Sequence, residues 1–412
     1  MASFSFGAGN AAKLVRIPLY LAGRIATIVI PRSRDEWVFG CAVGIADGAL
    51  ALWQQAQAAG ERAVWLTADA AQDADAAARG IPTIRKTSPR GFWRTARARV
   101  VVVTHGFGDV NRYAASGALV VQLWHGIPLK RLGLDSPATM RSPFLPRLTQ
   151  PLLRGLYRRT QHGIGVLPAA SHLVRGRLQS AFGLPDDRVA VTGEPRVDVL
   201  SAGDAGVRRR AARARIAALT GALRESQRVV LYAPTWRDGE PDPAVPDATQ
   251  WRQIADVLEQ HDALLLVRSH PLGAGDYTPA VPTDRVRRFG SDLASDVTPL
   301  LSGVDVLITD YSSIVYDASL VPVPAVFLAP DLERYAAERG FYGRYTDVAG
   351  DDAARTWTEA AAQLAAVLGD ETEWAERLIR AEELDRRVHA HRDGRNAERV
   401  HRAIRARLDR KA

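Results

Sequence analysis

The run ALVVQLW, residues 118–124, is followed directly by HGIPLK, and similar apolar runs recur along the chain between alanine- and arginine-rich stretches. Continuous apolar runs of this length are typical of strands that are covered on both faces. Their alternation with helices predicts a parallel sheet with right-handed crossovers. The other β-rich runs are 62–67, 100–105, 188–193, 228–234, 263–270, 305–310 and 324–329, and the helical candidates are 45–59, 168–182, 205–223, 250–261 and 356–368.

The alternation occurs twice, and the polar, arginine-rich stretch 201–215 separates the two sets. A chain of 412 residues is also long enough for two domains of roughly 200 residues each. We therefore predict an α/β protein with two doubly wound, Rossmann-like domains, 1–200 and 201–385, and a basic C-terminal helix over 386–412. Such folds bind ligands at the carboxyl ends of their strands, so the expected site is a cleft between the two sheets.

Composition limits the class of protein. Apolar residues make up 47% and charged residues 24% of the chain, which is the balance of a globular protein. The single cysteine, Cys41, excludes an internal disulfide framework and a multi-cysteine zinc site, and it indicates a reducing compartment. The net charge of +8 suits nucleic acid, anionic lipid, a phosphorylated substrate or a solvated surface. Because the 12 Lys/Arg residues in 375–412 are interleaved with acidic ones and match no nucleic-acid-binding motif, we predict no nucleic-acid partner.

Residues 14–30 are the most apolar early stretch, but Arg16, Pro18 and Arg24 interrupt it. A membrane-spanning helix needs about 20 apolar residues, so none is predicted here. Two interpretations remain. Either 1–33 associates with a membrane interface, which suits an apolar segment with intercalated arginines, or it forms a buried first strand followed by an amphipathic turn.

Polar residues follow four of the predicted strands, where doubly wound sheets place ligand contacts. They are His125, 235–238, His270 and 310–313. In the last group, Ser312 or Ser313 is expected to cap a helix. The free N–H groups of that helix and the two hydroxyls also suit a phosphate.

Arg237 and His270 each have a functional and a structural interpretation. Arg237 can bind a phosphate through its bidentate fork, or it can form a surface salt bridge with Asp238. Pro271 favours an extended backbone that exposes the imidazole of His270, although a lone histidine is more often structural than catalytic.

His125 precedes a turn in which Gly126 permits close backbone approach and Lys130 adds a cation. A histidine at the cleft can take a proton from an incoming hydroxyl near neutral pH, and so act as a general base. The alternative is a hydrogen-bonded core histidine beside Trp124.

Together these segments resemble the CDP-glycerol glycerophosphotransferase family, whose members prime or polymerise the glycerol-phosphate chains of wall teichoic acids and related capsules. The stretches 34–53 and 331–342 are similar as well, so the resemblance covers roughly residues 34–350. The shared motifs, in the order that the family shows, are LWHGIPLKRLG (123–133), GEPRVDVL (193–200), LYAPTWRDGE (231–240), RSHP (268–271) and LITDYSSIVYDASL (307–320).

The resemblance implies a GT-B-like fold, with the acceptor in the N-terminal domain and the donor in the C-terminal domain. It implies that an acceptor hydroxyl attacks the distal phosphorus of CDP-glycerol, or of a related CDP-polyol, and that CMP leaves. The implied site residues are His125 as the base, His270 at the donor phosphates, and a group at the donor's glycerol and phosphate end, namely Arg237, Asp310, Ser312 and Ser313. These side chains can stabilise the leaving group, so we predict transfer without a metal or cofactor.

Two positions depart from the family pattern. Ile127 stands where threonine is usual and Val197 where asparagine is usual, so the polyol and the acceptor stay open. The segment after His125 is unusually basic and the family's acceptors are lipid-linked. We therefore place Lys130 and Arg131 on an acceptor side that contacts an anionic leaflet, with ordinary solvated charge as the alternative. The protein is then expected to be cytoplasmic and peripheral on the inner face of the cell membrane.

Two other function classes remain. One is a GT-B glycosyltransferase that uses a nucleotide sugar, and the other is a non-enzymatic basic protein that binds a membrane. Both enzyme hypotheses predict that loss of His125 or His270 abolishes function, whereas the third predicts that both are replaceable. The sequence does not separate priming from polymerisation and does not fix the oligomeric state.

Overall fold

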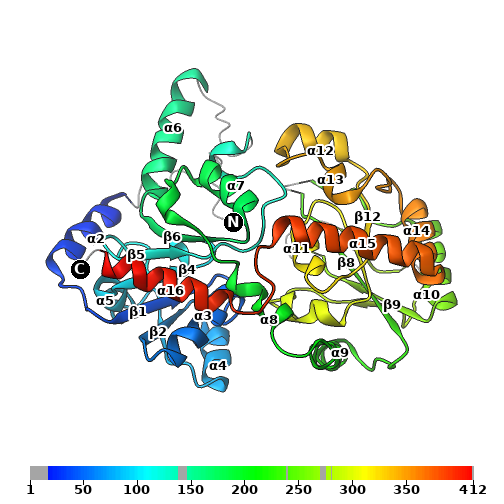
Figure 1. The fold of residues 1–412 in the computed structure, drawn as a ribbon, viewed down its shortest axis with the longest axis horizontal. Coiled ribbons are helices and arrows are strands. Elements are labelled where there is room, and N and C mark those ends of the chain that lie inside the picture. The colour runs from blue at the N-terminus through cyan, green and yellow to red at the C-terminus, as the bar shows by residue number, and fades with distance from the viewer. Residues whose placement is uncertain (1–16, 138–145, 238–239, 270–274, 280, 411–412) are drawn as a thin grey trace. The chain divides into compact units, whose positions relative to one another are not determined.

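The computed structural model describes residues 17–137, 146–237, 240–269, 275–279 and 281–410 (Figure 1). The chain forms two compact units. Unit 1 comprises Met1–His125, Arg131–Asp198 and Ala390–Ala412, and unit 2 comprises Gly126–Lys130 and Val199–His389. Within the described ranges, no helix combines the length and the apolar character needed to cross a membrane.

Unit 1 contains a seven-stranded parallel sheet. Its strands are β1 Glu36–Gly40, β2 Arg62–Thr67, β3 Thr83–Arg85, β4 Val100–Val103, β5 Leu119–Gln122, β6 Ile164–Ala169 and β7 Val189–Val191. Their order across the sheet is β3-β2-β1-β4-β5-β6-β7. Strands β1, β4 and β5 are buried along their whole length, so both faces of the sheet are covered. The order reverses between β1 and β4, and such a switch point is where open α/β sheets bind ligands.

Helices follow the strands of unit 1, and several begin at a side chain that caps the first free N–H groups. Asp69, Ser88 and Ser171 each accept such a bond. The helices are α2 Ile17–Val29, α3 Asp47–Ala58, α4 Ala70–Ala78, α5 Pro89–Arg97, α6 Pro146–Gln161, α7 His172–Phe182 and α16 Asn396–Asp409, and the short 3₁₀ turns are η1 Phe107–Asp109, η2 Gly133–Asp135, η3 Asp186–Arg188 and η4 Pro195–Val197.

Unit 2 contains a five-stranded parallel sheet with the order β10-β9-β8-β11-β12. The strands are β8 Arg228–Ala233, β9 Ala263–Val267, β10 Val286–Arg288, β11 Val306–Thr309 and β12 Ala325–Phe327. The switch point lies between β8 and β11. The helices are α8 Asp198–Ser201, which starts on the last residue of a unit 1 segment, then α9 Ala205–Thr220, α10 Ala248–Gln260, α11 Ile314–Ser319, α12 Leu332–Arg339, α13 Thr346–Ala349, α14 Trp357–Gly369 and α15 Glu371–Val388, with the 3₁₀ turn η5 Thr298–Gly303.

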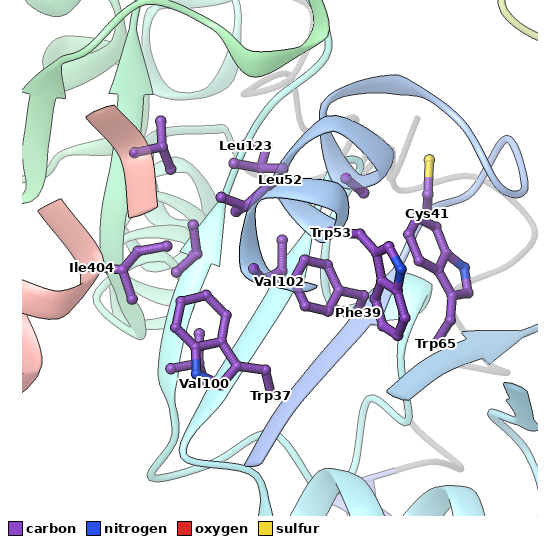
Figure 2. Packing of buried hydrophobic residues seen from close by; sticks show 14 of the residues in the cluster. Trp37, Phe39, Cys41, Leu52, Trp53, Trp65, Val100, Val102, Leu123 and Ile404 are labelled. Atoms are coloured by element: carbon purple, nitrogen blue, oxygen red, sulfur yellow. The ribbon is translucent and has the colours of Figure 1, made fainter. Parts of the chain in front are cut away.

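Aromatic rings from neighbouring strands form the centre of the unit 1 core (Figure 2). Phe39 stacks between the rings of Trp37 and Trp65, with centroids 6.2 and 6.0 Å away. Trp53 of α3 meets Phe39 edge-on at 5.1 Å. Complete burial of each such side chain contributes about 2–3 kcal/mol, so this cluster fixes the sheet against α3.

The C-terminal helix α16 packs on the same core. Val400, Ile404 and Leu408 are buried within the cluster, and the Asp198 carboxylate accepts the first two backbone N–H groups of α16 at 2.8 and 2.7 Å. The helix predicted over 386–412 is shorter in the structure, because Arg386 and Arg387 belong to the last turn of α15 and α16 begins at Asn396. The basic residues of α16 lie away from its buried apolar side. Its apolar side completes unit 1.

The predicted α/β fold class is confirmed, and each predicted β-rich run and helical candidate contains a strand or a helix of the structure. Four strands were not predicted, namely β1, β3, β6 and β10. The proposed buried first strand is wrong for residues 17–29, because these form helix α2. Residues 1–16 lie outside the described ranges.

One side of helix α2 packs closely against the rest of unit 1. A Cβ atom at Gly23 would lie 2.2 Å from the Tyr113 carbonyl oxygen, so glycine is needed for this approach. Tyr20 meets the Tyr113 ring edge-on at 4.9 Å. The remaining large apolar side chains of the helix are exposed, namely Leu19, Leu21, Ile25, Ile28 and Val29.

Candidate active site

The backbone around His125 is strained. His125 lies three residues beyond β5, and its neighbours Trp124 and Gly126 have φ angles of +64° and +130°. A positive φ is uncommon for a bulky residue and costs on the order of 1–3 kcal/mol, and such strain is concentrated at functional sites. The Trp124 ring packs edge-on against Phe182 at 5.1 Å, which helps to hold this conformation. The turn predicted at Gly126 is therefore present, and it begins one residue before His125.

The His125 imidazole is desolvated, and its Nδ1 atom is buried without a hydrogen bond to any described residue. Burial lowers the pKa of His125 well below its usual value. His105 and Arg196 lower the pKa further, whereas a hydrogen bond to the Thr104 backbone raises it. The ring is therefore neutral at pH 7. A histidine retained only for the core would normally have its buried nitrogen hydrogen-bonded, so the structural alternative fits poorly.

Asp109 organises the loop next to His125. One carboxylate oxygen of Asp109 accepts the backbone N–H groups of Thr104 and His105, both at 2.8 Å. The Thr104 hydroxyl lies 2.8 Å from Nδ1 of His105 and donates to Cys41 Sγ at 3.2 Å. The loop is thus fixed by its own hydrogen bonds. His105 is the last residue of the predicted β-rich run 100–105, and no local pattern marks it as a functional residue.

Cys41, Asp47 and His105 form the one group of potential metal ligands among the described residues, with donor atoms within 4.8 Å of one another. Burial strongly raises the pKa of the Cys41 thiol, so the sulfur stays protonated. The Asp47 carboxylate lies 3.4 Å from Nε of Arg196 and also accepts the Gly48 N–H. Because these donors are protonated or engaged, we assign no metal-binding role to the group.

Arg237 is the centre of a buried charge cluster in unit 2. Its Nε and Nη2 atoms bind both carboxylate oxygens of Asp331 at 2.9 and 2.8 Å, and Nη1 binds Asp310 at 2.9 Å. The guanidinium also lies 5.0 and 4.8 Å from the ring centroids of Tyr311 and Tyr335. Burial alone would lower the pKa of Arg237, but the two carboxylates raise it instead. The suggested surface salt bridge is therefore wrong, because Arg237 is buried and its partners are other residues.

The cluster leaves little of Arg237 free for a ligand. Besides the two carboxylates, Nη1 donates to the Thr235 carbonyl, so four of the five N–H groups have partners. Asp310 also accepts the backbone N–H groups of Thr235 and Tyr311. Asp310 and Arg237 thus tie the end of β8 to the end of β11, and the expected direct contact with donor phosphates stays a prediction.

Hydroxyl groups gather at the same two strand ends. Ser313 stands at the N-cap of α11, but its side chain makes no capping bond, and Ser312 Oγ lies 3.4 Å from the Ile314 N–H. The predicted capping is therefore weak. The Thr235 hydroxyl oxygen is buried and has no hydrogen-bond partner among the described residues. These hydroxyls remain available to a ligand.

The neighbours Lys130 and Arg131 belong to different units. Lys130 pairs with Phe341 in an isolated antiparallel bridge, and its Nζ lies 6.0 Å from the Tyr335 ring centroid. Burial lowers the pKa of Lys130 to about 8, and Asp310 opposes the shift. Arg131 is exposed in unit 1. Lys130 therefore belongs to the same unit as the Arg237 cluster, whereas Arg131 belongs to the other unit.

His270 lies outside the described residues. Strand β9, which leads to it, ends at Val267, and the Arg268 guanidinium donates to the Ala294 carbonyl at 2.8 Å. The two departures from the family pattern, Ile127 and Val197, are both buried apolar side chains.

Removal of the Arg237 guanidinium would leave two carboxylates buried without their cation. We expect Arg237→Ala to lower the free energy of unfolding by about 3–5 kcal/mol, measured by urea unfolding of the full chain. Arg288→Ala is the matched control, since it removes an exposed pair with Asp292. The control should cost less than about 1 kcal/mol. An equally small loss in both variants would contradict a structural role for the cluster.

Comparison with known proteins identifies relatives of this chain. The family model described as CDP-Glycerol:Poly(glycerophosphate) glycerophosphotransferase matches residues 33–406. The chain is 29% identical over 276 residues to the teichoic acid glycerol-phosphate transferase of Staphylococcus aureus (strain NCTC 8325 / PS 47), which covers 64% of this chain and 66% of that protein. It is 30% identical over 235 residues to the teichoic acid poly(glycerol phosphate) polymerase of Staphylococcus epidermidis. This match covers 55% of this chain and 31% of that protein. The match thus spans less than two thirds of either relative.

Among solved structures, the chain is similar to a variant of the wall teichoic acid polymerase TagF studied with CDPG. The TM-score is 0.76 at 20% identity, and the match covers 99% of this chain and 100% of that chain. At this identity the likeness speaks for the fold, and it confirms the expected GT-B-like α/β class.

Proposed function

This chain belongs to the CDP-glycerol:poly(glycerophosphate) glycerophosphotransferase family, and from that premise we propose that it transfers glycerol phosphate, or a related polyol phosphate, from a CDP-linked donor to an acceptor hydroxyl. The product would be a teichoic-acid-like or capsular polymer. The observation that carries the proposal is the neutral, desolvated imidazole of His125, whose Nδ1 has no hydrogen-bond partner among the described residues. Such a ring is unprotonated near neutral pH and has a nitrogen that can accept the proton of an acceptor hydroxyl.

The proposed reaction is a single displacement at phosphorus. The acceptor oxygen forms a bond to the distal phosphorus of the donor while its proton passes to His125. The bond between that phosphorus and the bridging oxygen breaks, and CMP leaves with the electron pair. The leaving group gains negative charge, so cationic and hydroxyl groups beside the donor phosphates accelerate the step.

We propose that unit 2 binds the donor phosphates. Lys130 supports this, because its ammonium forms no ion pair with any described residue and faces the Tyr335 ring in a desolvated position. The hydroxyls of Ser312, Ser313 and Thr235 are the accompanying donors. Arg237 then keeps in place the strand ends that carry these hydroxyls. At most its one remaining N–H group can donate to a donor phosphate.

We expect His125→Ala to reduce CMP release from CDP-glycerol by about 10²- to 10⁴-fold, because general-base catalysis contributes that much. The measurement is CMP release with a lipid-linked acceptor analogue, together with calorimetric titration of CDP-glycerol to show that donor binding persists. His162→Ala, which changes an exposed histidine of unit 1, is the control and should behave as the native protein.

Each other outcome has a definite meaning. Undiminished release from His125→Ala would remove His125 as the base. Turnover of CDP-ribitol or of a nucleotide sugar, with none of CDP-glycerol, would keep the fold and replace the donor. No turnover of any nucleotide donor by the native protein would favour the non-enzymatic hypothesis.

Lys130→Met should weaken CDP-glycerol binding by about 10- to 100-fold, since a hydrogen bond to a charged group is worth roughly 1.5–3 kcal/mol. The native dissociation constant should also rise as the pH increases through about 8, because the ammonium of Lys130 is lost there. The variant should lack this pH dependence. Arg131→Met is the neighbouring control and should leave the constant unchanged, and equal constants for Lys130→Met and native protein would exclude Lys130 from the donor site.

We further propose that unit 1 contacts an anionic membrane surface and that the enzyme is peripheral on the inner face of the cell membrane. Helix α2 supports this, because its exposed side carries five large apolar residues that are 52–78% accessible. Arg24 on the same helix and Arg154, Arg158 and Arg159 on α6 are exposed cations. Each basic residue near an anionic leaflet contributes about 1 kcal/mol, and the apolar side chains add burial in the interface. The lipid-linked acceptor would then meet the enzyme at this surface.

Val29→Asp should lower binding to phosphatidylglycerol vesicles by about tenfold or more, because burial of a valine side chain is worth roughly 1.5 kcal/mol. Vesicle sedimentation measures the bound fraction, and vesicles of phosphatidylcholine alone should bind the native protein more weakly. Val207→Asp changes an exposed valine on α9 of unit 2 and serves as the control. Equal sedimentation of both variants and the native protein would refute a membrane role for α2.

A further inference from the structure

His105 is an ionisable side chain that the proposed reaction does not use. It follows the end of β4 by two residues, at the switch point of the unit 1 sheet. We propose that His105 is a positioning residue for His125: its ring fixes the plane of the His125 imidazole, and the two rings together hold no more than one proton. This inference rests on the proposed role of His125 as the base.

The two imidazoles are stacked face to face. Their ring centroids are 4.3 Å apart and their planes differ by only 4°. The Trp124 ring lies 4.1 Å from that of His125 at a tilt of 34°. Stacking contacts the faces of an imidazole, so it holds the ring while leaving Nδ1 at the edge, where no described residue binds it, although a hydrogen bond to the Thr104 backbone also acts on this ring. His125 is therefore oriented by ring contacts instead of by a hydrogen bond at Nδ1.

His105 is itself held firmly enough to act as a support. Its backbone N–H donates to the Asp109 carboxylate, and its Nδ1 lies 2.8 Å from the Thr104 hydroxyl. The Gln122 side-chain amide donates to the Thr104 carbonyl at 2.9 Å, which joins this loop to the end of β5. The strand that leads to His125 is thus tied directly to the residue before His105.

The surrounding charges favour a proton on His105 over one on His125. Burial lowers the pKa of both rings, but the Asp109 and Asp47 carboxylates partly restore that of His105. For His125 the further influences of His105 and Arg196 both lower the pKa, although Arg196 also lowers that of His105. Cys41, the remaining titratable group packed against the pair, is a neutral thiol. As the pH falls, the first proton therefore enters His105.

A proton on His105 prevents His125 from acting as a base through charge repulsion alone. Two positive charges at this separation repel strongly in a desolvated site, so His125 next to an imidazolium cannot readily accept the acceptor's proton. The acid limb of the rate profile then reports the ionisation of His105. This distinguishes His105 from a merely structural residue, whose loss would lower the rate equally at every pH.

The test uses the full chain with two substitutions, His105→Phe, which keeps a stacking ring without a charge, and His105→Gln, which is smaller and polar. CMP release from CDP-glycerol is measured from pH 5 to 8.5 at saturating donor. The titration of the His125 ring is followed in parallel by NMR of selectively ¹³C-labelled histidine, assigned with His125→Gln. His162→Phe is the control for added aromatic bulk on unit 1.

We expect the acid limb of His105→Phe to move to lower pH by about one pH unit or more, because the group that protonates first is gone. The His125 resonance should move the other way and titrate at higher pH than in the native protein, since no neighbouring charge opposes it. His105→Gln should show the same two changes and should also lose about tenfold or more in rate at the plateau, because the stack that fixes the ring is absent.

An unchanged acid limb and an unchanged His125 titration in both variants, with both folded by circular dichroism, would overturn the proposal. The NMR titration does not depend on turnover. If the native protein releases no CMP from any CDP-polyol, the proposed function fails, while a His125 resonance that titrates at higher pH in both His105 variants than in the native protein would still establish the coupled pair.

Discussion

Both units depend on one constraint: a parallel strand that is covered on both faces can present polar groups only where it ends. Strands β4 and β5 of unit 1 and β11 of unit 2 are buried along their full length. The polar side chains that follow them therefore collect at the carboxyl edge of each sheet. In unit 1 this edge carries His105 and His125, and in unit 2 it carries the Arg237 cluster. The strand order then decides which loops become neighbours, because the reversal between β1 and β4, or between β8 and β11, opens the edge at that point.

The two edges solve the problem of buried polarity in opposite ways. In unit 2 the charge of Arg237 is matched by Asp310 and Asp331, and two aromatic rings pack against it, so the cluster is rigid and nearly saturated. In unit 1 burial lowers the pKa of both imidazoles, and Nδ1 of His125 is buried without a hydrogen bond to any described residue. A saturated cluster can hold a phosphate site in place, whereas an unsaturated neutral ring can change its protonation state.

The sequence predicted the elements whose apolar runs are long and uninterrupted, and it missed those without such runs. Strand β6 contains Pro168, and the three-residue strands β3 and β10 contain arginine, whereas β7 and β12 are equally short but entirely apolar and were predicted. The strand ends were found, but the partners were not. Asp331 lies 94 residues from Arg237, and no local pattern links them. Lys130 and Arg131 are predicted on the same side because they are adjacent in the chain. Adjacency does not reveal that the chain passes from one unit to the other between these two residues. Stacking of His105 on His125 depends in the same way on which strands are neighbours in the sheet.

The departures from the family pattern bear on the same electrostatics. Ile127 lies two residues after His125, and Val197 follows Arg196, which lowers the pKa of His125. Both are fully buried apolar side chains where the family pattern has a hydroxyl and an amide. In the chain, one position is therefore close to His125 and the other is next to a residue that lowers its pKa. An apolar side chain cannot hydrogen-bond an imidazolium, so neither position can stabilise a positive charge at His125. The low pKa of His125 is therefore set by burial, His105 and Arg196, and the side chains of Ile127 and Val197 do not oppose it.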